Sequence, residues 1–173
     1  MSENGIANNE TQPAREGGAV SVTTQPTRED EIKAYGQVYR ALNDVMGEFH
    51  GKSVIQLYSL ISRLRQEGNI LYLKCGKAFS TGFYEEMAGV SIKWFWDGVG
   101  LGKSDVTAFF QKLWKYHKKY LLPESTNEEF WKELCNEGVA IAENGQMPGQ
   151  AKHYISLIIG EVEKWRMKNE EAS

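Results

Sequence analysis

The stretch EDEIKAYGQVYRALNDVMGEFH, residues 29–50, carries an apolar side chain at every third or fourth position. The members of this stripe are Ile32, Tyr35, Tyr39, Leu42, Met46 and Phe49. Because this spacing is the period of an α-helix with one buried face, the stretch predicts a helix packed on a hydrophobic core. Thr27 is predicted to cap its N-terminus, with Asp30 in the first turn, where a carboxylate interacts favourably with the helix dipole.

A second helix is predicted over residues 53–66, directly after Gly51. Its apolar residues cover more than half of its circumference: Val54, Ile55, Leu57, Tyr58, Leu60, Ile61 and Leu64. A helix that is apolar over so wide an arc normally lies at the centre of the core, and this position is predicted here. Gly68 is predicted to end the helix by adopting the left-handed conformation.

Two short apolar runs follow, Ile70–Leu73 and Ile92–Trp96. Periodicity does not distinguish a strand from a helical turn in runs of this length. A minor β element near residues 70–97 therefore stays open.

Three further helices are predicted in the C-terminal half. The first begins at Ser104 as its N-cap and is stopped by Pro123, and His117 on its apolar face is predicted to be a packed core histidine. The second opens at Thr126 or Asn127. The last places one set of residues on a single face: Ala151, Tyr154, Ile155, Ile158, Val162 and Trp165. The last two helices are predicted to form an antiparallel hairpin over about 126–169.

The predicted fold class is all-α, mostly helical, with about five to seven helices. Residues 1–27 are too polar to offset their ordering entropy and are predicted to form a disordered tail, followed by a single helical domain over 28–173. The two cysteines form no paired motif, which favours a reducing compartment. No segment predicts a signal peptide or a membrane span, so a soluble, cytoplasmic protein without a membrane partner is expected.

Charge is distributed unevenly. The chain has a net charge of −3, yet residues 51–122 hold eleven basic and five acidic side chains, a net of +6. This basic middle either faces an acidic partner or pairs with the acidic ends of the same chain.

Catalytic and metal-binding motifs fail on inspection. Residues 97–104 resemble a phosphate-binding loop, but Asp97 stands at the required first glycine, where a carboxylate would repel phosphate. Cys75 lacks the second cysteine and the two histidines of a zinc finger. The three histidines have no ligand or triad partners at suitable spacing. We therefore expect no enzyme, no cofactor and no metal site.

The first functional hypothesis is a non-catalytic protein-binding module. Aromatic residues beside a glycine-rich loop make good interface anchors if exposed and core residues if buried. A row of lysines on the Ser104–Leu122 helix predicts either a contact surface or a solvated face. The candidate partner-binding residues are Trp94, Phe95, Trp96, Lys112, Lys115, Tyr116 and Lys119.

The alternative hypothesis is a nucleic-acid-binding protein. Residues 84–97 resemble a degenerate helix-turn-helix, with Gly89 at the turn, although Glu85 and Gly98 depart from that pattern. The candidate contacts to nucleic acid are Lys93, Lys103, Lys112, Lys115 and Lys119. Nucleic acid therefore stays a possible partner beside another protein.

The C-terminal region carries one resemblance. Residues 129–134, 151–152, 155–158 and 161–164 resemble the C-terminal hairpin of short helical proteins encoded by phages and prophages of Gram-positive bacteria. The similarity is a pattern of aromatic, acidic and aliphatic positions over about forty residues. It implies a mobile-element protein in the cytoplasm of a bacterial host, where such proteins act as inhibitors or accessories of host complexes. No site residue is carried over from it.

Overall fold

The computed structural model describes residues 25–98, 102–121, 126–143 and 148–171. Six α-helices span these ranges: α1 (Arg28–Phe49), α2 (Leu57–Cys75), α3 (Thr81–Trp96), α4 (Lys103–Tyr120), α5 (Glu128–Glu143) and α6 (Pro148–Glu171). Single 3-10 turns at Val54–Gln56 and Gly76–Ala78 flank α2. The all-α prediction is confirmed. The β element left open near 70–97 is absent, because those residues belong to α2, the second 3-10 turn and α3. Most of the predicted tail, residues 1–24, lies outside the described residues.

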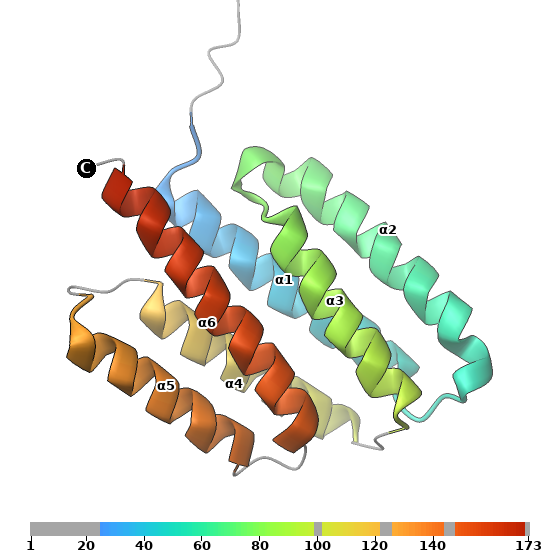
Figure 1. The fold of residues 1–173 in the computed structure, drawn as a ribbon. Helices are drawn as coiled ribbons and strands as arrows, with labels where there is room; N and C mark the ends of the chain where they lie inside the picture. The colour runs from blue at the N-terminus through green and yellow to red at the C-terminus, as the bar shows by residue number, and fades with distance from the viewer. Residues whose placement is uncertain (1–24, 99–101, 122–125, 144–147, 172–173) are drawn as a thin grey trace, which may run out of the picture.

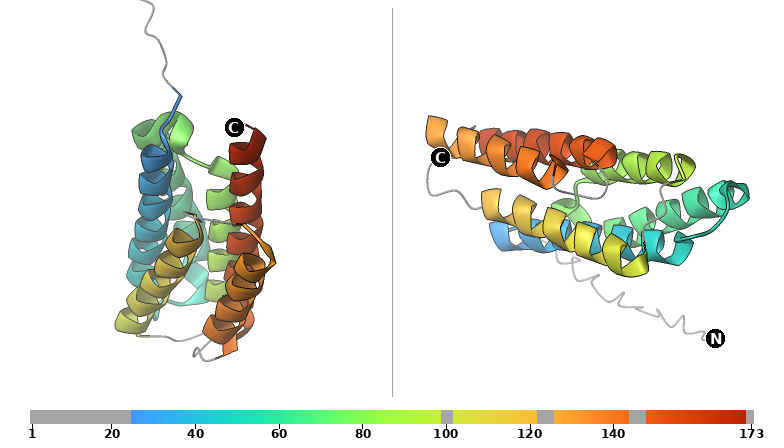
Figure 2. Two further views of the ribbon diagram at one scale, coloured as in Figure 1. Left: turned by 90° about the vertical axis from the view of Figure 1, so that its left-hand side faces the viewer. Right: turned by 90° about the horizontal axis from the view of Figure 1, so that it is seen from below.

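The helices form two layers of three (Figures 1 and 2). One layer holds α1 between α2 and α4, and the other holds α6 between α3 and α5. Successive helices α2 and α3 run antiparallel and face each other across the layers at one edge of the molecule, and α4 and α5 lie at the opposite edge. Because α2 has a neighbour on one flank only within its layer, much of its circumference faces outward.

The helix α1 follows its sequence pattern closely. Tyr35, Tyr39, Leu42, Met46 and Phe49 are buried. The predicted N-cap is confirmed: the Thr27 hydroxyl accepts a hydrogen bond from the Asp30 amide at 3.2 Å, and the Asp30 carboxylate accepts one from the Thr27 amide at 3.0 Å. This reciprocal pair satisfies two amides that the first turn would otherwise leave unbonded.

The predicted end of α2 at Gly68 is wrong, because the helix continues to Cys75. Gly68 serves close packing instead of termination. A Cβ atom at this position would lie 2.8 Å from Cε1 of Tyr84 on α3. The Tyr84 hydroxyl reaches past it and donates a hydrogen bond to the Leu64 carbonyl at 2.7 Å.

The predicted cap of α4 is also wrong. Gly102, not Ser104, is the N-cap, and the helix begins at Lys103. The Asp105 carboxylate accepts a hydrogen bond from the Gly102 amide at 3.2 Å and so satisfies one donor at the start of the helix. The predicted stop at Pro123 falls outside the described residues.

The C-terminal hairpin is confirmed as two packed helices, α5 and α6. Asn127 is the N-cap of α5, since its side-chain oxygen accepts a hydrogen bond from the Phe130 amide at 3.0 Å. All six residues of the predicted apolar face of α6 are buried: Ala151, Tyr154, Ile155, Ile158, Val162 and Trp165.

Two of the polar groups buried inside the core are His117 and Glu161. His117 is fully buried, as predicted, among the rings of Tyr35, Tyr39, Phe83 and Trp114. Its Nδ1 is hydrogen-bonded to the Tyr39 hydroxyl at 2.9 Å, and its Nε2 has no partner among the described residues. Burial lowers the pKa of His117 from its ordinary value near 6.5 to about 3, so the imidazole is neutral in the folded protein.

The second buried polar group is Glu161 of α6. Its Oε1 accepts hydrogen bonds from the Tyr35 hydroxyl at 2.6 Å and the Ser80 hydroxyl at 2.9 Å. The carboxylate therefore joins α6 to α1 and to the residue that precedes α3. Bonds of this kind fix the relative positions of the two layers.

Candidate functional site

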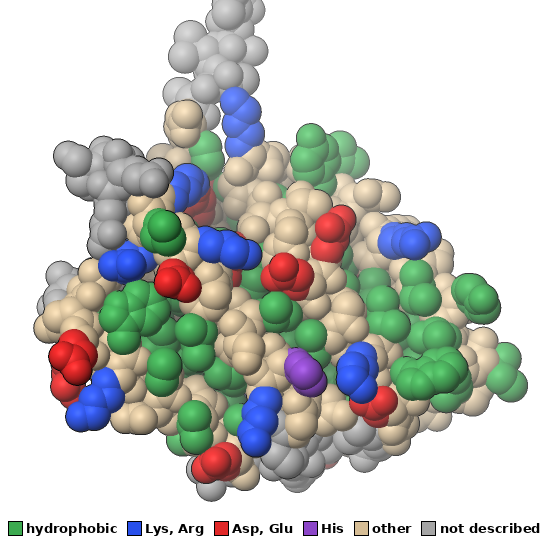
Figure 3. Space-filling model, viewed as in Figure 1, with side chains coloured by type: hydrophobic (Ala, Val, Ile, Leu, Met, Phe, Trp, Pro, Cys, Tyr) green, Lys and Arg blue, Asp and Glu red, His purple; other side chains and the backbone are tan. Residues whose placement is uncertain are grey.

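Exposed hydrophobic side chains are concentrated on α2 and the turn before it. Among the described residues, six of the nine large hydrophobic side chains that are exposed belong to this segment: Val54, Ile55, Tyr58, Ile70, Tyr72 and Leu73. Ile55, Tyr58 and Leu73 are 90%, 85% and 82% exposed. In Figure 3 hydrophobic side chains gather over this edge of the molecule. Single exposed apolar residues are ordinary, whereas large contiguous apolar patches are typical of interaction sites.

This distribution contradicts the prediction that the helix starting near Ser53 lies at the centre of the core. Within α2 only Leu60, Leu64 and Leu71 are buried. The reason is its position at the edge of the molecule, where α1 and α3 are its main neighbours and ten of its nineteen residues are exposed. The apolar arc is as wide as the sequence indicates, and much of it faces solvent.

A groove runs between α2 and α3, and one of these exposed side chains, Tyr72, lines it. Its volume is about 640 Å³, within the range of ligand-binding clefts. The α2 wall consists of Ile61, Leu64, Arg65, Gly68, Asn69 and Tyr72, and the other wall of Phe79, Thr81, Tyr84, Glu85, Ala88, Gly89 and Ile92. Helical spacing places Trp96 one turn beyond Ile92, at the end of the groove.

Small residues hollow this groove. A Cβ atom at Gly89 would meet no atom within 4 Å, so this part of α3 has open space before it. Gly68 on the facing wall allows Tyr84 to pack against the α2 backbone. The open space of the groove therefore lies at Gly89, and the place beside Gly68 is filled by the Tyr84 ring.

One cation lies among the apolar residues of the α2 wall. Arg65 is exposed, follows Ile61 by one turn, and forms no ion pair with any described residue. Glu85 on the α3 wall is the acidic lining residue of the groove, and no ion pair joins the two. Arg65 is therefore available to a carboxylate from outside.

The three aromatic residues predicted to bind a partner all belong to the end of α3 and differ in their exposure to solvent. Trp94 is 2% exposed and packs on Phe109 and Phe110, with ring centroids 5.5 and 6.1 Å away, so it is a core residue and cannot be a contact residue. Phe95 is half-buried and packs edge-on against Phe49. Trp96 is 59% exposed. Of the three, only Trp96 presents a large surface to solvent.

The residues of the predicted lysine face on α4 also differ in their burial and their contacts. Tyr116 is buried, and its hydroxyl donates to the Leu134 carbonyl of α5 at 2.8 Å, so its inclusion among contact residues is wrong. Lys119 binds the carboxylates of Glu133 and Glu137 at 2.8 and 2.6 Å. Lys112 and Lys115 are exposed and line a shallow cleft against α5. This face therefore serves largely to hold α5 on α4.

The predicted helix-turn-helix is wrong. Residues 84–97 contain no turn at Gly89, because α3 is continuous from Thr81 to Trp96. Lys93 forms an ion pair with Asp97 at 2.9 Å, and the Lys103 side chain lies along α1 beside Gly47. The candidate nucleic-acid contacts are thus spread over α3 and both ends of α4.

Within the described ranges, little supports a metal site, a phosphate-binding loop or a membrane-spanning helix. No group of three or more histidine, cysteine or acidic side chains is placed to hold a metal ion among the residues that the structure describes. The run Ile92–Trp96, which would be the strand of a phosphate-binding loop, is helical. None of the described helices is both long enough and apolar enough to cross a membrane.

Comparison of the chain with protein-family models, with curated proteins and with solved structures found no match. Sequence reasoning missed the groove residues Arg65 and Tyr72 and the exposed Tyr58 on the same helix as site residues. The signal was present as the width of the apolar arc, which exceeds what a helix at an edge can bury.

Proposed function

We propose that this chain is a non-catalytic protein-binding module that holds its partner in the α2–α3 groove and on the adjoining face of α2. The observation that carries the proposal is the group of six exposed hydrophobic side chains on one segment. Covering a large apolar side chain contributes about 1.5–3 kcal/mol. The free protein forgoes this stabilisation at several positions, and a partner seated there would recover it.

The occupant that fits is an amphipathic helix of another protein. A groove between two helices accepts side chains at helical spacing from the apolar face of a third helix. Arg65 lies between Ile61 and Tyr72 on the same wall. A partner helix with a carboxylate among its apolar anchors would pair with this guanidinium in a charge-assisted hydrogen bond.

A second copy of the chain fits less well. Tyr58 and Tyr72 each lie seven residues from Arg65, so an antiparallel α2 pair that matches the two tyrosines would place both Arg65 side chains on the symmetry axis. Two like charges there would oppose association. A heterologous partner with an acidic side chain avoids this cost.

The role of an inhibitor or accessory of a host complex rests on the resemblance of the C-terminal hairpin to phage and prophage proteins. The groove adds a physical means to it. A module that captures a helix of a host protein would block the contacts that this helix makes within its own complex.

The test compares two double variants of the full chain as bait in a lysate of the source organism. Tyr58→Ser/Leu73→Ser removes two exposed side chains from the α2 face, and Val139→Ser/Met167→Ser removes two from α5 and α6. Neither pair is buried, so both variants should keep the free energy of unfolding of the parent within about 0.5 kcal/mol per substitution. The captured protein is expected to fall at least about tenfold with the first pair only, as for two anchors worth over 1 kcal/mol each.

Equal capture by both variants would contradict the proposal. Sedimentation of the purified chain supplies the remaining check. A monomer is expected, and a dimer that becomes monomeric in Tyr58→Ser/Leu73→Ser would assign the face to a second copy and overturn the choice of partner.

A further inference from the structure

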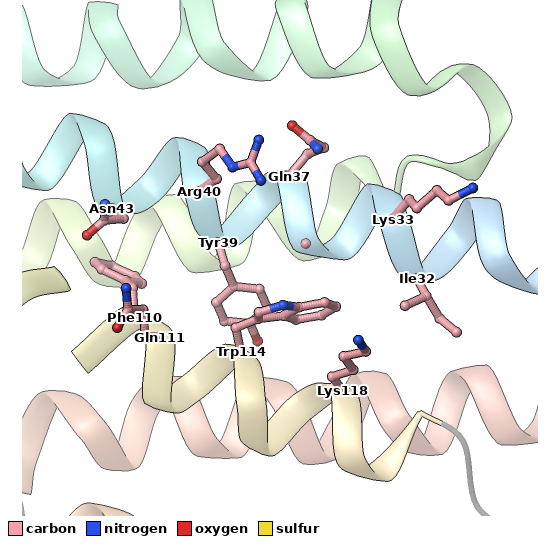
Figure 4. Close-up of a pocket in the computed structure, with 11 residues that line it drawn as sticks. Ile32, Lys33, Gln37, Tyr39, Arg40, Asn43, Phe110, Gln111, Trp114 and Lys118 are labelled. Atoms are coloured by element: carbon pink, nitrogen blue, oxygen red, sulfur yellow. The ribbon is translucent and has the colours of Figure 1, made fainter. Parts of the chain in front are cut away.

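A second cleft lies between α1 and α4, on helices that do not form the α2–α3 groove (Figure 4). Its volume is about 550 Å³. Gly36 allows Trp114 to lie against the α1 backbone, since a Cβ atom on Gly36 would be 3.2 Å from Cζ2 of the indole. Tyr39 supports the indole from the core, with the ring centroids 5.3 Å apart. The cleft therefore presents a fixed, half-buried aromatic surface.

The charges around this indole are all positive. Lys33 and Arg40 of α1 and Lys118 of α4 line the cleft, and none of its eleven lining residues is acidic. Arg40 and Lys118 form no ion pair with any described residue, and Lys33 has one contact of 3.9 Å with the exposed Glu29. In a chain whose net charge is −3, three such cations around one cleft favour an anionic ligand.

Amide side chains complete the lining. Gln37, Asn43 and Gln111 each offer a donor and an acceptor. The side-chain oxygen of Asn43 is buried and has no hydrogen-bond partner among the described residues. Figure 4 shows Trp114 between Arg40 and Gln37 on one side and Lys118 on the other.

We propose that this cleft binds a nucleotide, with its base against Trp114 and its phosphate on a cation beside the indole, Arg40 or Lys118. Arginine and lysine bind phosphate oxygens through charge-assisted hydrogen bonds, and an aromatic side chain stacks on a base of any sequence. The same chemistry serves a free nucleotide and one unit of a single-stranded nucleic acid. This site is independent of the protein-binding groove. It uses none of the candidate nucleic-acid contacts that were derived from the sequence.

The experiment measures fluorescence anisotropy of two probes at low salt with the full chain: a labelled adenosine triphosphate and a labelled single strand of twelve nucleotides. Arg40→Gln/Lys118→Gln removes the two unpaired cations of the cleft. Lys112→Gln/Lys115→Gln removes the same charge from the other side of α4 and serves as the matched control. All four side chains are exposed, so circular dichroism should show unchanged folding.

The unaltered chain and the control are expected to bind, and Arg40→Gln/Lys118→Gln to bind at least tenfold more weakly. A strand that carries an abasic site in place of each base should also bind about tenfold more weakly, because it has nothing to stack. Binding of the triphosphate alone would identify a free nucleotide as the ligand, and binding of the strand a nucleic acid. The proposal is overturned if neither probe binds at millimolar concentration, or if the control pair weakens binding equally.

Discussion

Lowering the pH from 6.5 to 4.5 is expected to reduce the free energy of unfolding by about 2–3 kcal/mol through His117 alone. The folded protein holds the pKa of this imidazole at about 3, whereas the unfolded chain has the ordinary value near 6.5. Below pH 6.5 the imidazole of His117 therefore binds a proton in the unfolded state and stays neutral in the native state. This contribution of His117 to the free energy of unfolding is fully present above pH 6.5 and is lost progressively as the pH falls toward 3.

Urea denaturation at pH 7.5 and at pH 4.5 measures this loss. His117→Gln removes the titrating ring and keeps a side chain able to hydrogen-bond to Tyr39, so its loss of stability between the two pH values should be smaller by 2–3 kcal/mol. His153→Gln, at an exposed position of α6, is the control and should lose as much as the parent. If His117→Gln and the parent lose the same stability, then His117 is not a buried neutral histidine.

A methyl group added at Gly138 is expected to destabilise the fold by about 1–3 kcal/mol, against the usual benefit of alanine in a helix. A Cβ atom there would lie 2.7 Å from Cγ2 of Ile155 and 2.8 Å from the Tyr116 hydroxyl. Both neighbours are buried, and Tyr116 is held by its hydrogen bond to the Leu134 carbonyl. Side chains of α4 and α6 meet the α5 backbone at this point, and because both are buried neither moves away easily.

Gly89→Ala is the matched substitution, also within a helix, at a position with open space. It should stabilise the protein by about 0.5–1 kcal/mol because alanine loses less backbone entropy than glycine. Thermal or urea unfolding of both variants gives the comparison. If Gly138→Ala raises the free energy of unfolding as Gly89→Ala does, then the packing around Gly138 has room for a methyl group.

Periodicity predicted the helices that have one narrow apolar face. The stripes of α1 and α6 repeat at 3.6 residues over many turns, and such a signal leaves little choice of buried side. Thr27 and Asp30 marked the start of α1 because a capping box depends only on neighbours in sequence. The C-terminal pairing of α5 and α6 followed from the short connection between them.

The incorrect predictions concern residues whose role is set by packing against helices that are distant in the sequence. Gly68 has the residue type of a helix end, yet its role is set by Tyr84, sixteen positions away on another helix. Tyr116 is adjacent to lysines in the sequence, but α5 covers it. The wide apolar arc of α2 indicated contact on several sides, and a sequence does not state whether those contacts come from the same chain or from a partner.

The most direct test of the protein-binding groove fills it from Gly89 on the α3 wall and leaves the other lining side chains unchanged. Gly89→Gln places a long neutral side chain in the open space of the groove, and Gly160→Gln adds the same side chain at an open position of α6. Both variants should be at least as stable as the parent, because glutamine is a better helix former than glycine. With the variants as bait, capture of the partner is expected to drop at least about tenfold for Gly89→Gln and to stay unchanged for Gly160→Gln. Undiminished capture by a folded Gly89→Gln variant would contradict the assignment of the groove as the partner site.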